Sequence, residues 1–248
     1  MTISSCPAFR TFSVLNPLLT YSIDPLGDSA LLIQFENKLD ETINKKVLHV
    51  FRELKKSGVL WIKDIVPAYT SLAVHYNCFA IVKEEGHQTI FETVVAQIEK
   101  IIDDTDDQPE VTQRAIRVPV CYEKRYAPDL EQLAAEKGLT AHQVIELHTA
   151  KSYRVYMIGF LPGFAYMGEV DERIVFPRKQ QPANVVAGSV GIAGKQTGIY
   201  PLNSPGGWQI IGRTPLPLFN KQKQNPTLFN PGDEVIFYSI TEDEFESY

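Results

Sequence analysis

The sequence predicts an α+β protein with two domains, a small α/β domain followed by a domain of many short strands. Up to about residue 108, strand-like runs alternate with two amphipathic helices. From Ser152 onward no helical period is visible, and short β-type runs alternate with Gly- and Pro-rich turns. Ten of the fifteen glycines lie between Gly159 and Gly212. This pattern favours a sandwich or a barrel over a parallel sheet for the second domain.

The elements of the first domain follow from their boundary signals. Asp40 is placed to cap a helix with one apolar face, and Gly58 is placed to stop it. Pro67 marks an edge or a bend of the sheet. The expected elements are a strand at 29–35, a helix at 41–57, strands at 59–69 and 70–77, and a helix that carries Ile90, Val94, Ile98 and Ile101 on one stripe.

The domain boundaries are set by changes in composition. Residues 1–20 lack the charged and apolar regions of a signal peptide and are expected to be a loosely held N-terminal extension. The acidic run 103–110, which contains a proline, is expected to be a solvated linker. The predicted organisation is therefore an extension at 1–20, an α/β domain at 21–108 and a β domain at 112–248.

The second domain begins with a strand and two short helices. Thr140 and Gln143 have the spacing of a capping box. The expected elements are a strand at 115–122, helices at 128–138 and 140–148, a strand at 152–158 and a last strand at 233–240. Pro162, Pro205 and Pro231 each precede a glycine, which is the signature of a type II turn, because glycine accepts a positive φ at the next position.

Composition excludes several classes of function. The formal net charge of −6 and the lack of a basic stripe argue against nucleic-acid binding. No run of about 18 apolar residues exists that would cross a membrane. Cys6, Cys78 and Cys121 are far apart and lack metal-ligand spacing, so free thiols in the cytoplasm are expected.

The sequence also lacks the common motifs for nucleotides and metals. Residues 189–196 resemble a phosphate loop only superficially, because the pattern needs glycine at Ser189 and a hydroxyl residue at Gln196. Gly198 and Pro201 forbid the helix that must follow it. No zinc-protease, CxxC or GxSxG motif is present, so we expect no metal site and no cofactor bound in this chain.

The candidate site centres on the apolar loop 159–168. Phe164 and Trp208 each follow a Pro-Gly pair, and polar side chains lie beside glycines between them, which suits a ligand pocket. The alternative is that the loop and its aromatic residues are part of the core. The candidate catalytic residues are His148, Arg178 and Gln196, and the candidate substrate-binding residues are Tyr166, Ser189, Tyr200, Trp208 and Arg213.

Each charged candidate has an ordinary alternative role. His148 ends a helix, so it either transfers protons near the pocket or stabilises the helix C-terminus. Arg178 and Arg213 either bind a carboxylate or phosphate with two hydrogen bonds or form surface ion pairs.

Five segments together resemble a known family, which includes the B subunit of ATP-dependent 5-oxoprolinase, Kip-type inhibitors of a sporulation histidine kinase, and subunit 1 of allophanate hydrolase and urea carboxylase. The resemblance covers about residues 21–241. The segments are PLGDSALLIQF, PDLEQLAAEKGLTAHQVIELHT, YRVYMIGFLPGFAYMG, FPRKQQPANVVAGSVGIAGKQTGIYPLNSPGGWQIIGRTP and NPGDEVIFYSI. The extension before Tyr21 is longer than the usual start of the family.

The resemblance implies a cyclophilin-like β-barrel for the second domain and a cleft shared with a partner protein. The implied partners are a related barrel subunit of the C or KipA type and a further protein of the A type. The implied activity is the ATP-dependent opening of 5-oxo-L-proline to L-glutamate, with ATP held on a partner or at a shared interface. The alternatives that the family leaves open are a histidine kinase inhibitor and a carboxyltransferase-type subunit of a urea-degrading system.

Overall fold

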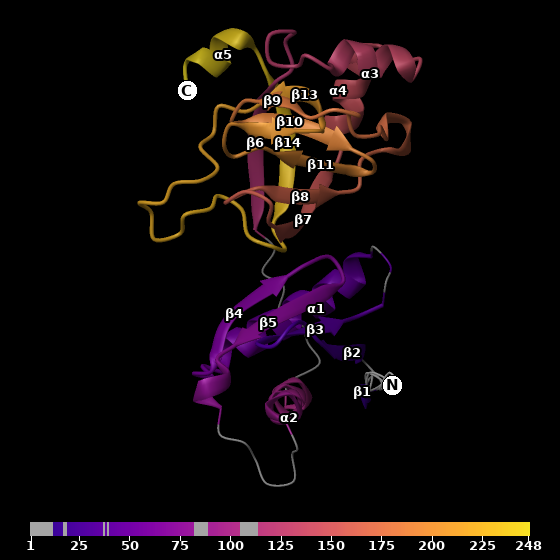
Figure 1. Ribbon diagram of the computed structural model, residues 1–248. Coiled ribbons are helices and arrows are strands. Elements are labelled where there is room, and N and C mark those ends of the chain that lie inside the picture. Colours follow the sequence, from indigo (N-terminus) through magenta and orange to yellow (C-terminus); the bar gives the residue numbers. More distant parts are fainter. Residues whose placement is uncertain (1–11, 17–18, 37, 39, 82–88, 105–113) are drawn as a thin grey trace, which may run out of the picture. The chain divides into compact units, whose positions relative to one another are not determined.

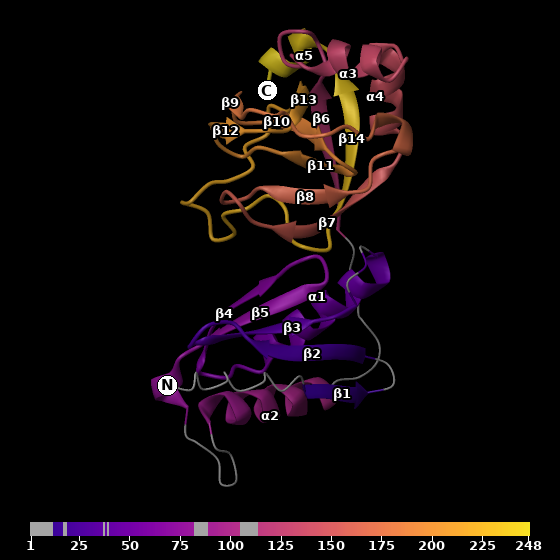
Figure 2. The same ribbon diagram turned by 45° about the vertical axis from the view of Figure 1, so that its right-hand side comes forward.

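The computed structural model describes residues 12–16, 19–36, 38, 40–81, 89–104 and 114–248. The chain divides into two compact units, residues 1–111 and 112–248 (Figures 1 and 2). Each unit has its own hydrophobic core. The first unit combines a sheet with two helices, and the second is built on a closed barrel. The predicted fold class is confirmed. Within the described residues, no helix is long and apolar enough to cross a membrane.

The first unit is a five-stranded antiparallel sheet in the order β1-β2-β3-β5-β4. Its elements are β1 (Phe12–Asn16), β2 (Leu19–Pro25), β3 (Ala30–Gln34), α1 (Glu41–Lys56), β4 (Ile62–Pro67), β5 (Ser71–Tyr76) and α2 (Ile90–Asp103). Alternate strand residues such as Ile33 and Val74 share one core with Val47 of α1 and Ile98 of α2. Both helices therefore cover the same face of the sheet.

The helix boundaries of this unit match the expected signals. The Asp40 carboxylate accepts hydrogen bonds from the backbone N–H groups of Thr42 and Ile43, and α1 ends just before Gly58, whose φ is 64°. The sheet begins earlier than expected, because β1 lies inside the stretch 1–20 and pairs with β2. Most of the acidic run 103–110 lies outside the described residues.

The second unit is a barrel in the order β10-β11-β8-β7-β14-β6-β13. Only the β6–β14 pair is parallel among these described strands. Its elements are β6 (Ala115–Cys121), α3 (Leu130–Glu136), α4 (Ala141–Thr149), β7 (Ser152–Ile158), β8 (Ala165–Gly168), β9 (Ala183–Val185), β10 (Ser189–Ala193), β11 (Gln196–Ile199), β12 (Ser204–Gly206), β13 (Gln209–Arg213), β14 (Glu234–Ile240) and α5 (Glu242–Glu246).

The barrel strands separate two sets of side chains. One set, which includes Val190, Ile199 and Met167, belongs to the large core of this unit. The alternate positions, such as Tyr166 and Ala193, pack with Trp208 in a smaller outer cluster. This second cluster concerns the candidate site.

One expected turn is wrong. Pro162 and Pro231 are each followed by a glycine with positive φ, 86° at Gly163 and 94° at Gly232, as a type II turn requires. Pro205, by contrast, lies inside β12, which pairs with β9. Gly206 is needed for space instead, because a Cβ at this position would lie 2.5 Å from the Tyr200 hydroxyl oxygen.

Candidate functional site: an aromatic face on the outside of the barrel

Four aromatic rings gather on the outer side of the barrel, in a group that we call the aromatic face: Phe164, Tyr166, Tyr200 and Trp208. The Phe164 ring centroid lies 4.7 Å from that of Tyr166, 5.1 Å from that of Tyr200 and 5.3 Å from that of Trp208. The Phe164 contacts with Tyr200 and Trp208 are edge to face, an arrangement favoured by the quadrupoles of the rings. The loop 159–168 therefore contributes to a small second core outside the barrel wall, in which Phe164, Tyr200 and Trp208 are almost fully buried and only Tyr166 is partly exposed.

Two glycines let Trp208 lie against the barrel wall. A Cβ at Gly191 of β10 would lie 3.1 Å from the Trp208 Cβ. A Cβ at Gly198 of β11 would lie 3.0 Å from Cζ3 of the same ring and 2.9 Å from the backbone oxygen of Ala165. The glycine-rich run that resembles a phosphate loop is thus the β10–β11 hairpin, and its glycines make room for an aromatic ring.

Phe160 stands beside the aromatic face and is 63% exposed. Its ring centroid is 5.6 Å from that of Phe164 and 6.4 Å from that of Tyr200. Its φ is 67°, a left-handed conformation that is unfavourable for a bulky residue. The tight loop imposes it: the Gly159 N–H donates to the Phe164 carbonyl and the Phe164 N–H donates to the Leu161 carbonyl. Strained backbone of this kind is concentrated at functional sites.

Arg178 is held above the aromatic face by its chain neighbours. The Pro177 carbonyl accepts a hydrogen bond from the Gln209 side chain at 3.0 Å, and the Lys179 N–H donates to the Gly207 carbonyl at 2.7 Å. Lys179 Nζ also lies 2.6 Å from a carboxylate oxygen of Asp129. This segment is fixed to the chain around Trp208 on both sides of Arg178.

The Arg178 guanidinium carries an unneutralised charge over the Trp208 ring. Its Cζ is 5.9 Å from the ring centroid, and it has no hydrogen-bond or ion-pair partner among the described residues. Burial raises the pKa of Tyr166 and of Tyr200, and the nearby Arg178 charge works against that rise at both residues. The backbone N–H of Trp208 also holds the pKa of Tyr200 down. A guanidinium over aromatic rings suits a planar anion such as a carboxylate.

Gln196 belongs to the same side of the barrel. It opens β11 and lies two residues before Gly198, so that both residues face outward. Ser189 is buried at the start of β10, and its carbonyl accepts a hydrogen bond from the Tyr200 N–H. The structure brings Arg178, Tyr166, Tyr200 and Trp208 together, with Gln196 on the same side.

Arg213 is directed elsewhere. It ends β13, and its Nε donates to the Ala187 carbonyl at 2.9 Å. Its guanidinium carbon lies 5.7 Å from the ring centroid of Phe245 in α5. These contacts tie Arg213 to the 187 loop and the C-terminal helix, and neither of them is with a ring of the aromatic face.

His148 lies inside the barrel core and is fully buried. Its Nδ1 is 2.9 Å from the Tyr122 hydroxyl and its Nε2 is 2.9 Å from the Thr197 hydroxyl, while its ring stacks on Phe237 and Tyr153. Burial lowers the pKa of His148 from 6.5 to about 3. The structure thus separates His148 from the other candidates and leaves its ring without contact to solvent.

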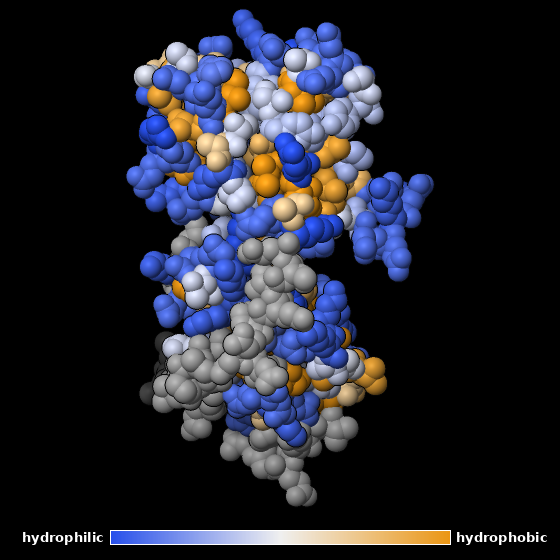
Figure 3. Space-filling view, turned by 180° about the vertical axis from the view of Figure 1, so that it is seen from behind, coloured by the Kyte–Doolittle hydropathy of each residue, from blue (hydrophilic) through white to orange (hydrophobic). Residues whose placement is uncertain are grey.

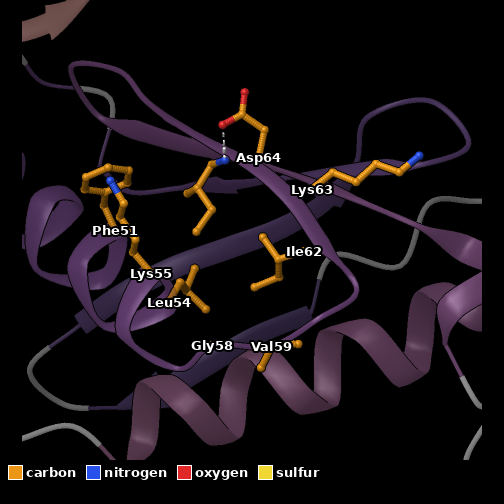
Figure 4. A pocket seen from close by; sticks show the side chains of 9 residues that line it. Phe51, Leu54, Lys55, Gly58, Val59, Ile62, Lys63 and Asp64 are labelled. Carbon is orange, nitrogen blue, oxygen red and sulfur yellow. Dashed lines mark hydrogen bonds between the residues drawn. The ribbon is translucent and has the colours of Figure 1, made fainter. Parts of the chain in front are cut away.

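Two surface pockets lie away from the aromatic face. One, of about 260 Å³, lies in the first unit between the end of α1 and β4, where Lys55 folds over the Phe51 ring (Figure 4). The other, of about 270 Å³, lies in the second unit and is lined by Tyr122, Ala127, Leu130, Ile145 and Ile240 among others. Neither is lined by a predicted site residue. Among the described residues, no group of three or more His, Cys, Asp or Glu side chains is arranged to hold a metal ion.

Sequence reasoning missed Tyr122 and Thr197, the two partners of His148. Thr197 stands between Gln196 and Gly198, and the alternation of a strand would have turned it inward once that strand was recognised. No sequence pattern predicts the role of Tyr122, because its hydrogen bond to His148 depends on how α4 packs on the barrel.

Comparisons with known proteins agree with this architecture. The family described as the carboxyltransferase domain, subdomain C and D, matches residues 21–229. The B subunit of 5-oxoprolinase from Bacillus subtilis (strain 168) is 41% identical over 231 residues, which cover 92% of this chain and 96% of that protein. Urea amidolyase of Saccharomyces cerevisiae is 25% identical over 98% of this chain, which corresponds to 15% of its own length. The crystal structure of TTHA0988 superposes with a TM-score of 0.73 at 30% identity, covering 86% of this chain and 40% of that chain.

Proposed function

Because the chain belongs to the family of 5-oxoprolinase B subunits, we propose that it is one component of an ATP-dependent 5-oxoprolinase, which opens 5-oxo-L-proline to L-glutamate. The observation that carries this proposal is the 41% identity to a B subunit of 5-oxoprolinase over nearly the whole of both chains. The unneutralised Arg178 on the aromatic face supports it, because the substrate is a small carboxylate with a flat lactam ring.

The chemistry requires an activated intermediate. Amide resonance makes the lactam carbonyl a poor electrophile, so transfer of the γ-phosphoryl group of ATP to the amide oxygen creates a leaving group. Water then adds to the ring carbon, and the C–N bond breaks as the nitrogen takes up a proton, which leaves a γ-carboxyl phosphate of glutamate. A second water hydrolyses this acyl phosphate, so that the products are glutamate, ADP and phosphate. Arg178 binds the substrate carboxylate in this proposal, and Gln196 orients water. Tyr166 contacts the substrate ring, and the buried Tyr200 and Trp208 support that binding surface from behind.

We place ATP on a partner protein or at a shared interface. The run 189–196 forms the β10–β11 hairpin instead of a phosphate loop followed by a helix. The proposed partners are a related barrel subunit of the C type and a further protein of the A type. Ser189 and Arg213, which contact the chain around Tyr200 and Ala187, support the site from its edge.

One observation favours a second candidate. The likeness to urea amidolyase extends over 98% of this chain, so a carboxyltransferase-type role in a urea-degrading system is the alternative. The two candidates differ in their substrate, 5-oxoproline or a urea-derived carboxylate. The genes that accompany this one, encoding oxoprolinase components or a biotin carboxylase, separate them before any assay.

The test is co-expression with the neighbouring subunits, followed by an assay of glutamate release. The complex should release glutamate from 5-oxoproline only when ATP is present, and this chain alone should release none. Arg178→Met should raise KM for 5-oxoproline by about 10- to 100-fold, because a charge-assisted hydrogen bond is lost. Arg117→Met is the matched control, since its guanidinium lies 5.0 Å from the Tyr238 ring centroid. No ATP-dependent glutamate release by the complex, or an equal effect of both variants, would count against the proposal.

A further inference from the structure

A network of hydrogen bonds crosses the barrel core from Tyr122, the residue directly after β6, to β10. The Tyr122 hydroxyl meets His148 Nδ1, His148 Nε2 meets the Thr197 hydroxyl, and the Thr197 hydroxyl donates to the Gly191 carbonyl at 3.0 Å. The side chains of Tyr122, His148 and Thr197 are all buried. These contacts join a strand, a helix and the β10–β11 hairpin, which are far apart in the sequence.

The donor and the acceptor of every hydrogen bond in this network are fixed. The Thr197 hydroxyl has one proton and donates it to Gly191, so it can only accept from His148 Nε2–H. Nδ1 then carries no proton and accepts from the Tyr122 hydroxyl. The low pKa of His148 agrees with this single neutral tautomer. Each polar side-chain atom of the hydrogen-bond network has a partner. The network therefore rigidifies the strands that it joins.

The network ends directly beneath the aromatic face. Thr197 points inward, and its chain neighbours Gln196 and Gly198 face outward. Gly191, whose carbonyl receives the last hydrogen bond, lies under the Trp208 Cβ. The inward contacts of Thr197 therefore fix the backbone that supports the Trp208 ring and Gln196.

We propose that Tyr122, His148 and Thr197 are positioning residues, which hold the β10–β11 hairpin so that Gln196 and Trp208 are placed for substrate. None of the three touches substrate in this proposal. The expected effect of these residues on turnover rests on the proposed function. Their expected effect on the placement of Trp208 rests on the geometry alone.

The isolated chain provides the first test. The chain has two tryptophans, so Trp61→Phe leaves Trp208 as its only fluorophore of this kind. In that background Thr197→Val removes the hydroxyl from the network and keeps the branched shape. The matched control is Tyr153→Phe, which also removes a buried hydroxyl. That hydroxyl donates to the backbone carbonyl of His148 at 2.8 Å and is not part of the network that leads to Thr197.

We expect acrylamide to quench Trp208 about twofold faster in Thr197→Val than in Tyr153→Phe, because local opening of the hairpin exposes the ring. Thr197→Ser should restore the slow quenching. Equal quenching in the two main variants, or no restoration by serine, overturns the proposal. If Thr197→Val does not fold, Tyr122→Phe takes its place against the same control and the same criterion.

The reconstituted complex provides the second test. Thr197→Val should lower kcat about tenfold and leave KM within about twofold, because a small displacement of an orienting group costs mainly turnover. Tyr153→Phe should retain kcat at equal thermal stability. A changed quenching rate with unchanged kcat overturns the role in turnover. If the wild-type complex opens no 5-oxoproline, the proposed function fails, and the quenching comparison still decides the positioning role.

Discussion

His148 illustrates how burial decides the chemistry of a titratable side chain. Its ring is enclosed by Tyr153 and Phe237, and both nitrogens are engaged with neutral hydroxyls. A proton added to this ring would have to break the Tyr122 hydrogen bond and sit as a charge in an apolar core. The geometry therefore favours a structural role in the neutral form over proton transfer.

His148 should make the stability of the chain depend on pH below about 6.5. Its pKa is about 3 in the folded chain and near 6.5 when unfolded, so the unfolded state binds more protons between these values. The stabilisation is complete above pH 6.5 and is lost as the pH falls. Between pH 6 and pH 5 the free energy of unfolding should fall by about 1 kcal/mol through this residue.

Urea titrations at several pH values measure this effect. His148→Gln should remove that part of the pH dependence, and His142→Gln, which changes an exposed histidine, should retain it. The titratable groups that touch His148, Tyr122 and Tyr153, both have a raised pKa and do not titrate in this range. The same pH slope in wild type and His148→Gln would contradict the assignment.

Individual residues were predictable from the sequence only where local chemistry decides their surroundings. Asp40 and Thr140 cap helices as expected, because a cap depends on residues two or three positions away. The surroundings of Arg213 and His148 depend on segments more than 25 residues away, such as α5 and β11. No local signal carries that information.

At the scale of elements, the hairpin β10–β11 and the small β9–β12 sheet show why glycines gather between residues 188 and 207. The sequence indicated Gly- and Pro-rich turns there. The structure places Gly191, Gly198 and Gly206 in strands, where they leave space for aromatic rings, whereas Gly188 and Gly194 have a positive φ. Type II turns account for Gly163 and Gly232, whereas Gly206 is a strand residue placed against Tyr200. Composition alone does not distinguish a glycine needed for positive φ from one needed for space.

Gly206→Ala should therefore destabilise the second unit, and Gly207→Ala should not. The added methyl at Gly206 would lie 2.5 Å from the Tyr200 hydroxyl oxygen, but at Gly207 its nearest neighbour is a backbone oxygen 3.8 Å away. We expect a loss of about 1–3 kcal/mol for Gly206→Ala and a change within about 0.5 kcal/mol for Gly207→Ala. Thermal or urea unfolding of the two variants measures both. A change within about 0.5 kcal/mol in Gly206→Ala as well would show that Tyr200 moves aside.

The exposed edge of the first sheet is protected against pairing with other chains. β4 lies at this edge, and the Asp64 carboxylate accepts a hydrogen bond from the N–H of Ile65 at 2.8 Å, as Figure 4 shows. Pro67 has no N–H to offer, and the register shifts between Ile62 and Asp64. Such features prevent strand addition. The expectation that Pro67 marks an edge or a bend is consistent with this arrangement.

Asp64→Ala should increase self-association of the chain by freeing the Ile65 N–H for another strand. Sedimentation or light scattering over a range of concentrations measures this tendency. Lys63→Ala is the control, because it removes a neighbouring exposed charge without touching the hydrogen bond. Equal self-association of the two variants would mean that general charge, not the blocked N–H, keeps the edge unpaired.

At the scale of the whole molecule, the chain consists of two units with separate cores, and each unit has exposed apolar residues on its surface. Figure 3 shows hydrophobic side chains at several places on one side of the second unit, with hydrophilic surface between them. Phe160, Val186 and Leu202 are exposed by 63%, 48% and 38%. Phe160 borders the aromatic face, so a partner that covered it would also enclose the proposed substrate site. Sequence patterning indicated the apolar loop but not which of its side chains is exposed.

Phe160 should be an anchor for the proposed hetero-complex, and Phe160→Asp should abolish or severely weaken assembly. Truncating a central aromatic anchor costs about 2 kcal/mol or more, roughly a thirtyfold loss of affinity, and the introduced charge adds a desolvation cost. The variant should fold, because aspartate tolerates the positive φ of 67° better than phenylalanine does. Phe79→Asp is the matched control, since Phe79 is also an exposed phenylalanine but belongs to the first unit. Co-purification with the partner subunits and elution on a sizing column measure assembly. A Phe160→Asp chain that elutes with its partners as the wild type does, or a Phe79→Asp chain that loses them equally, would place the interface elsewhere.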